Sequence, residues 1–225
     1  MPDEATTGGK LGIVTLDLTP DELLSTTRSV RKRLDLTRPV ERQTVLDCLA
    51  LALQAPTGSN RQGWAWMFVE DADKKLSIAD LYGAHFDEYA KVPIPWKAGD
   101  PRQAQGDRVL DSATYLREHF HEVPIMMIPL FRGRIDGLPV PSAAGAWGSI
   151  LPAVWSFMLA LRSRGLGSAW TTLHLRSERE VAEICGIPYD EYTQAGLFPI
   201  AYTMGTDFKP AARLDAAPLV HWNEW

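Results

Sequence analysis

The strongest constraint on the fold is one long apolar helix, predicted over PSAAGAWGSILPAVWSFMLALRSRG (residues 141–165). Ser142 is a suitable cap for its start and Gly165 for its end. The apolar run within it, Ile150 to Leu161, is too short to span a bilayer and contains Pro152. We therefore expect this helix to be covered by other protein, in a fold with a large core and no membrane partner.

The first half of this helix and the end of the chain are both suited to close packing. The tail, APLVHWNEW, is too apolar to remain in water and is expected to pack on other protein, including a second subunit. A helix lined by small side chains can approach another backbone closely. These small residues are Ala143, Ala144, Gly145, Ala146, Gly148 and Ser149.

Apolar periodicity and turn residues divide the rest of the chain into alternating helices and strands. Helices are predicted over 20–27, 39–55, 72–83, 107–121 and 177–185, strands over 64–71, 123–131 and 197–205, and a β-like segment over 167–175. This mixture favours helices layered on a central sheet. Residues 1–10 are expected to be a disordered tail, and 11–225 a single domain. Residues 84–106 are predicted to be a long lid or binding loop, with Phe86, Tyr89 and Trp96 as covering aromatics.

Charge and motifs exclude several classes of function. The 225 residues carry a net charge of -5, which argues against a nucleic-acid binder. His119 and His121 do not share a helix face, so a metal site is not expected. The start MPDEATTGGK has no apolar signal segment, and Cys48 and Cys185 follow no metal or redox spacing, which indicates a cytoplasmic protein with buried, reduced thiols. GxSxG, HExxH and Walker motifs are absent from the sequence, so it does not support a hydrolase or an NTPase function.

Three polar segments are candidates for binding. Arg28, Ser29 and Arg31 combine planar cationic donors with a hydroxyl, which suits a phosphate; a solvated basic turn is the alternative. Asn60 and Gln62, in the turn APTGSNRQGW (55–64), offer amide donors and acceptors that can read the edge of a heterocycle; simple turn chemistry is the alternative. The segment GLGSAWTT (165–172) lacks the context of a dinucleotide-binding fingerprint, although its backbone can follow a flat ligand.

In this order, the segments resemble the nitroreductase family of FMN-dependent oxidoreductases. The resemblance runs from about residue 22 to the end and is closest to a subgroup of oxidoreductases from mycobacteria and related actinobacteria. It implies an α+β, three-layer fold with a central, mostly antiparallel sheet, and an intimate homodimer with FMN at the interface. Four stretches carry it: RSVR (28–31), APTGSNRQGW (55–64), RGLGSAWTTL (164–173) and PIAYTMGTDFKPAARL (199–214).

The resemblance assigns roles to matching positions. It implies that the first segment holds the FMN phosphate and reaches the pyrimidine edge of the flavin, that the second lies beside the flavin, that backbone N–H groups of the third meet flavin N5, and that the fourth returns to the phosphate. Many relatives have Gly-Gly or Glu-Gly in place of Thr171-Thr172, which leaves open which N–H meets N5, and often have Pro in place of Gly63. The implied cofactor-binding residues are Arg28, Ser29, Arg31, Ser59, Asn60, Gln62, Thr171, Thr172, Leu173, Lys209 and Arg213.

The implied activity is reduction of FMN by NAD(P)H, followed by reduction of a small electron-poor acceptor in ping-pong order. Because the flavin supplies the redox chemistry, no separate acid–base dyad is needed. Arg31 would then stabilise negative charge on the reduced flavin. Nitroaromatics, quinones, activated alkenes, halogenated phenols and flavins all remain open as acceptors. The alternatives are a flavin-sequestering protein, another flavin reaction on this fold, and an anion- or partner-binding module without flavin.

Overall fold

A five-stranded sheet forms the centre of the computed structural model, which describes residues 15–93, 100 and 102–225. Strand β2 is its middle strand: β1 pairs with one edge, β5 and β4 pair with the other, and β3 extends the sheet from β5, with every pair antiparallel. The implied α+β fold with an antiparallel sheet is confirmed. The strands are β1 (Trp64–Val69), β2 (Ile125–Arg132), β3 (Leu166–Gly167), β4 (Tyr192–Gln194) and β5 (Phe198–Tyr202).

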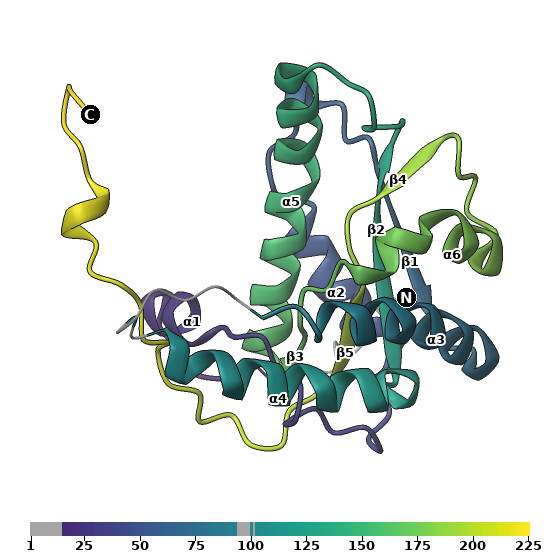
Figure 1. The fold of residues 1–225 in the computed structure, drawn as a ribbon, viewed down its shortest axis with the longest axis horizontal. Helices are drawn as coiled ribbons and strands as arrows, with labels where there is room; N and C mark the ends of the chain where they lie inside the picture. Colours follow the sequence, from purple (N-terminus) through teal and green to yellow (C-terminus); the bar gives the residue numbers. More distant parts are fainter. Residues whose placement is uncertain (1–14, 94–99, 101) are drawn as a thin grey trace, which may run out of the picture.

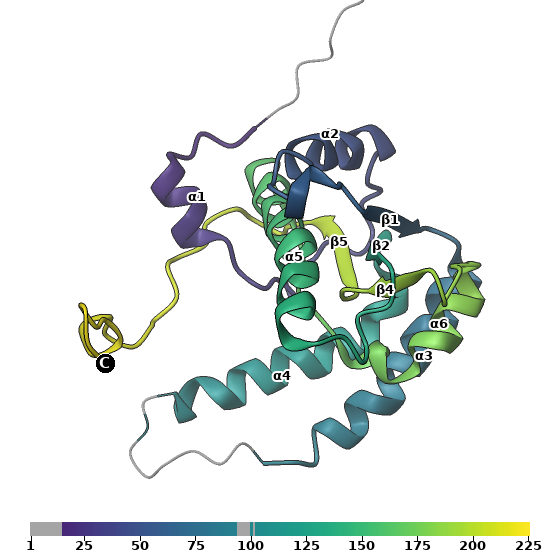
Figure 2. The ribbon, with the colours of Figure 1, turned by 90° about the horizontal axis from the view of Figure 1, so that it is seen from above.

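Helices cover both faces of this sheet, which makes three layers (Figures 1 and 2). One face carries α2 (Arg42–Ala52) and α5 (Val140–Ser163); the other carries α3 (Ala72–Tyr89), α4 (Gln103–His119) and α6 (Glu178–Cys185). Alternate residues of β2 serve the two faces, because side chains along a strand point to opposite sides. Ile125 and Met127 pack with α2 and α5, whereas Met126 and Ile128 pack on the opposite side.

Helix α5 begins earlier than predicted. It starts at Val140, after Pro139 and with Pro141 in its first turn, so Ser142 lies inside the helix and does not cap it. Gly165, with φ +74°, follows its end as predicted. Among the described residues α5 alone is long and apolar enough to cross a membrane, but its contacts with α2 and the sheet are those of a core helix. Only 44% of its most apolar window is buried within this chain.

The loop predicted over residues 84–106 was wrong at both ends, because α3 runs to Tyr89 and α4 begins at Gln103. Helix α3 continues through Gly83 to Tyr89, because Ile78, Tyr82 and Phe86 recur every four residues and all three are buried in the core. Gly83 packs against the Arg117 guanidinium, which leaves little room for a larger residue. Phe86 is therefore a core residue rather than a lid residue, and Tyr89 lies exposed on α3. Trp96 lies outside the described residues, as does the predicted tail over residues 1–10.

Other boundaries were partly right. A capping box begins α1 (Pro20–Thr26), with Thr19 and Glu22 exchanging hydrogen bonds. No side-chain hydrogen bond from Ser177 caps α6, and α2 begins at Arg42 rather than near Pro39. The β-like segment over 167–175 is mostly a bridge and a 3₁₀ turn, η3 (Leu173–Ser177), after the two residues of β3. Cys48 is fully buried and Cys185 only partly buried.

His174 is a fully buried histidine whose ring nitrogens have no hydrogen-bond partner in the structure. Burial lowers its pKa to about 3, and the adjacent Gln194 offsets this only slightly. In the unfolded chain this histidine becomes protonated below about pH 6.5, whereas in the folded chain it becomes protonated only below about pH 3. The free energy of unfolding therefore falls as the pH falls from 6.5 to 3.

We expect the titration of His174 to lower the free energy of unfolding by about 2 kcal/mol between pH 7 and pH 5. This figure follows from the roughly 1.4 kcal/mol that each unit of pKa difference contributes. Urea unfolding at the two pH values measures the drop. A His174→Phe variant keeps the ring but cannot titrate, and should show a drop smaller by that amount. An equal drop in the variant would contradict the assignment.

Candidate functional site

A cavity of about 800 Å³ opens where four parts of the chain meet beside Trp170. They are the segment after α1, the face of α4, the second half of α5 and the segment after β5. Its lining includes Thr27, Arg28, Ser29, Arg31, Gln105, Arg108, Val109, Ser112, Trp155, Met158, Trp170 and residues 210–213. The structure thus brings Arg28, Ser29 and Arg31 together with Arg213, which is distant in sequence.

The first arginine segment is held in place by the sheet edge. The Val30 N–H donates to the Ser168 carbonyl at 2.8 Å, and Ser29 bridges Ser168 in parallel orientation. Val30 is buried, which turns its neighbours toward the cavity. Gly167 makes this approach feasible, since a Cβ there would lie 2.9 Å from the Val30 Cβ and 2.7 Å from the Thr203 Cγ2.

The last arginine segment is tied to the first by a single hydrogen bond. Arg28 Nη1 donates to the Lys209 carbonyl at 2.7 Å, and Pro210 to Arg213 then line the cavity. The Lys209 side chain itself does not line it. Lys209 therefore contributes its backbone, and the predicted meeting of residues 28–31 with residues 209–213 is present in the structure.

The cavity is strongly cationic. Arg28, Arg31, Arg108 and Arg213 line it, no carboxylate does, and none of the four has an ion pair among the described residues. Burial lowers the pKa of Arg31, but a guanidinium remains charged under ordinary conditions. Arg31 Nη1 donates only a 3.3 Å bond to the Ser112 hydroxyl.

The two cations that follow Arg31 in the sequence are paired with carboxylates. Lys32 pairs with Asp111 at 2.5 Å and Arg33 pairs with Asp207 at 2.6 Å. Within residues 28–33, the arginines without an ion pair among the described residues are thus the two that line the cavity, which is expected where a ligand supplies the anion.

The turn that contains Ser59, Asn60 and Gln62 adopts a strained backbone. All three residues have positive φ, at 53°, 51° and 48°, although none is glycine. Such conformations cost on the order of 1–3 kcal/mol each and concentrate at functional sites. The turn, whose middle forms η1 (Gly58–Asn60), is held to α5 by a 3.0 Å bond from the Gly58 N–H to the Ser149 hydroxyl.

The amide side chains of this turn are exposed. Gln62 Nε2 donates to Asn60 Oδ1 at 3.0 Å, which leaves the second amide hydrogen of Gln62 and the amide of Asn60 directed to the surface. Ser59 lines a second cavity of about 610 Å³, together with Arg132, Gly145 and Ser149. This cavity lies at the first half of α5, whereas the arginine cavity lies at its second half.

The segment after β3 has two unused backbone donors. The Thr171 N–H and hydroxyl both bond the Leu197 carbonyl, at 3.2 and 2.6 Å, so this N–H is not available to a ligand. The N–H groups of Thr172 and Leu173 have no acceptor among the described residues. None of the three lines the arginine cavity, although the preceding Trp170 does.

Comparison with known proteins agrees with this fold. The profile of the Nitroreductase family matches residues 24–202. This chain belongs to the nitroreductase family. A search of curated proteins finds no match for it.

Solved structures of low identity share the fold of this nitroreductase-family protein. Oxidized iodotyrosine deiodinase bound to FMN and 3-iodo-L-tyrosine is 21% identical with a TM-score of 0.69, over 91% of this chain and 99% of that one. The FMN and NADPH-dependent nitroreductase NfnB of sphigopyxis sp. strain HMH is 20% identical with a TM-score of 0.65, over 92% and 100%. A BluB-like flavoprotein from Clostridium difficile 630 is 16% identical with a TM-score of 0.65, over 91% and 99%.

Sequence reasoning missed the contribution of α4 in this nitroreductase-family protein. Gln105, Arg108, Val109 and Ser112 follow the i, i+3, i+4, i+7 spacing of a single helix face, and that face lines the cavity. The spacing is visible in the sequence. It was overlooked because the first of these residues was assigned to a loop.

The predicted site residues fall into two groups that lie apart. Gly145 beside the second cavity and Met158 beside the first are separated along α5 by roughly 20 Å, from a rise of 1.5 Å per residue. The structure of one chain therefore does not bring Ser59, Asn60 and Gln62 to the arginines.

Proposed function

We propose that this protein binds FMN and uses NAD(P)H to reduce small electron-poor acceptors such as nitroaromatics or quinones, in ping-pong order. The observation that carries the proposal is the cavity lined by four arginines and no carboxylate. The proposal includes residues 11–225 as a single FMN-binding domain, a cytoplasmic location, and membership of the subgroup from mycobacteria and related actinobacteria.

The residues around the cavity fit FMN chemically. A phosphate monoester carries up to about two negative charges and accepts bidentate bonds from arginine. Trp155, Met158 and Trp170 supply apolar surface for a flat ring system. The unused N–H groups of Thr172 and Leu173 suit a ring nitrogen acceptor. Among the residues that the structure describes, no carboxylate lines the cavity to compensate its positive charge.

Each residue then has a stated role. Arg28, Ser29 and Arg213 hold the phosphate, and the Lys209 carbonyl orients Arg28. Arg31, which is deeper and bonded to Ser112, lies at the pyrimidine edge and stabilises negative charge there. FMN held there would supply the redox chemistry between the nicotinamide donor and the acceptor. The protein contributes position, electrostatics and the exclusion of water.

A homodimer would unite the two groups of predicted site residues. In a two-fold dimer the same surface meets itself, and two α5 helices that pack along their exposed faces run antiparallel when the two-fold axis crosses them at right angles. The first half of one α5 then lies beside the second half of the other. This arrangement brings Asn60 of the partner subunit and Gln62 of the partner subunit toward the arginine cavity, as the family resemblance implies.

Two exposed apolar features support this dimer. Ala144, Gly148 and Trp155 form an open stripe along α5. After β5 the chain leaves the body as an extended arm (Figure 1), in which Leu219, Trp222 and the fully exposed Trp225 have nothing to cover them. A single chain does not bury these side chains, whereas a second subunit would.

The colour of the purified protein tests the proposal. We expect a yellow protein that loses its absorbance near 450 nm when NADPH or NADH is added without oxygen, and regains it with a nitroaromatic or quinone. A yellow protein that neither donor bleaches would instead indicate flavin sequestration. A colourless protein that takes up no added FMN would exclude both.

The same assay ranks the acceptors. A panel of a nitroaromatic, a quinone, an activated alkene and a halogenated phenol, each added anaerobically to the reduced protein, distinguishes nitro or quinone reduction from ene reduction and dehalogenation. Turnover of only the alkene or the phenol would replace the proposed reaction by one of the latter two.

A further inference from the structure

The arginine cavity holds more positive charge than FMN needs. Arg28 and Arg213 suffice for the two charges of the phosphate, and Arg31 serves the pyrimidine edge. Arg108 remains, exposed on α4 and without an ion pair among the described residues. This count rests on the function proposed above.

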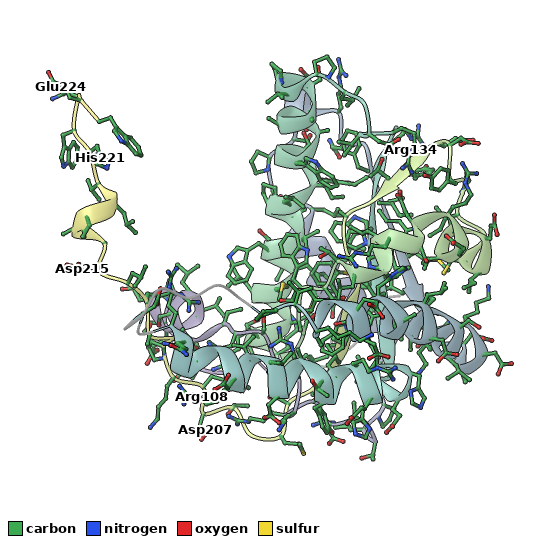
Figure 3. All side chains as sticks on the ribbon, in the orientation of Figure 1. Arg108, Arg134, Asp207, Asp215, His221 and Glu224 are labelled. Atoms are coloured by element: carbon green, nitrogen blue, oxygen red, sulfur yellow. The ribbon has the colours of Figure 1, made fainter. Side chains whose placement is uncertain are left out.

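Two carboxylates near this part of the chain are already paired, and among the described residues no ion pair joins Asp107 to its neighbour Arg108. Asp111, on α4 itself, pairs with Lys32, and Asp207 pairs with Arg33. Figure 3 labels Arg108 on α4. The Arg108 guanidinium has no ion pair among the described residues, and an exposed guanidinium at the cavity is open to an incoming anion.

The orientation of α4 directs this charge into the cavity. Ser112 accepts the bond from Arg31 Nη1, which fixes that face of the helix against the site. Arg108 lies one turn before Ser112 on the same face, with Gln105 nearly another turn further. Val109 and Trp155 add apolar surface to the same lining.

We propose that Arg108, assisted by the Gln105 amide, recognises a carboxylate on the electron acceptor, so that the preferred acceptors are electron-poor aromatic acids. The apolar lining receives the ring and the guanidinium receives the carboxylate through paired N–H donors. Arg108 is then a specificity-determining residue that makes no contribution to holding FMN.

A matched pair of acceptors tests this. For wild type we expect kcat/KM for 4-nitrobenzoate to exceed that for the neutral 4-nitrobenzamide by about 10-fold or more. Arg108→Gln should lower this ratio by about 10- to 100-fold, the factor that a charge-assisted bond contributes. Arg108→Lys should retain part of it. Arg179→Gln, which removes an exposed arginine of α6 outside the cavity, should leave the ratio unchanged. An unchanged ratio in Arg108→Gln overturns the proposal.

Two further readouts separate the causes of failure. Stopped-flow reduction by NADPH and by NADH shows whether Arg108 instead binds the 2′-phosphate of the donor. If NADPH but not NADH reduces the Arg108→Gln variant more slowly than wild type, and the ratio of kcat/KM for the two acceptors is unchanged, then Arg108 binds the donor and the proposal is overturned. FMN content is measured by absorbance. If the FMN-loaded variant turns over and its ratio of kcat/KM for the two acceptors equals that of wild type, only the role of Arg108 is refuted. If the wild-type protein holds no FMN, the proposed function is refuted as well.

Discussion

An Arg28→Ala variant is expected to bind FMN on the order of 100-fold more weakly than wild type. Each hydrogen bond to a charged group contributes about 1.5–3 kcal/mol, and the substitution removes those to the phosphate. It also removes the 2.7 Å bond to the Lys209 carbonyl and so loosens the segment that carries Arg213. Titration of the apoprotein with FMN, followed by flavin fluorescence, measures the dissociation constant.

Three companion variants make this result specific. Arg213→Ala should weaken binding by about 10-fold, because it removes a charge-assisted contact but leaves the tether intact. Arg28→Lys should recover part of the loss. Lys32→Ala removes an exposed cation that pairs with Asp111 and should change the affinity little. Equal affinities in wild type, Arg28→Ala and Arg213→Ala would refute the phosphate assignment.

Replacing Gly148 by leucine is expected to dissociate the dimer and to empty the site of FMN. In the isolated chain nothing lies within 4 Å of the position of a Cβ at Gly148, so leucine is tolerated there and should stabilise the helix by about 0.8 kcal/mol. In the proposed dimer the same side chain meets the partner helix and forces the two apart. Dissociation of the dimer, instead of a gain in helix stability alone, would therefore show that Gly148 lies in the interface.

Sedimentation equilibrium and FMN content measure this second effect together. Ala84→Leu places the same side chain at an exposed position of α3, outside the proposed interface, and should leave both quantities near the wild-type values. A Gly148→Leu protein that remains dimeric, or a wild-type protein that is monomeric while holding FMN, would contradict the shared site.

Periodicity explains which parts of the fold could be predicted from sequence. The apolar run of β2 predicted a strand, and the small and apolar residues of α5 predicted a long helix; both are confirmed. The end of α3 could not be predicted from local signals, because Gly83 normally indicates a stop. The burial of Phe86 one turn later outweighs it.

The candidate site was predictable as segments but not as an arrangement. Local composition drew attention to Arg28, Arg31 and Asn60, and motif order related them to a family. The sequence could not reveal that the Thr171 N–H is used by Leu197, nor that two groups of site residues lie at opposite ends of α5. Both depend on tertiary contacts between distant positions.

The left-handed turn at Ser59, Asn60 and Gln62 makes this protein less stable than its fold allows. Three such residues together cost on the order of 3 kcal/mol or more, a substantial share of the roughly 5–15 kcal/mol that holds a domain folded. Glycine would adopt the same backbone without strain but would remove the amides that face the surface. Selection for thermal stability alone should therefore favour glycine in this turn. The resulting protein would be more stable but would lack the exposed amide groups of Asn60 and Gln62.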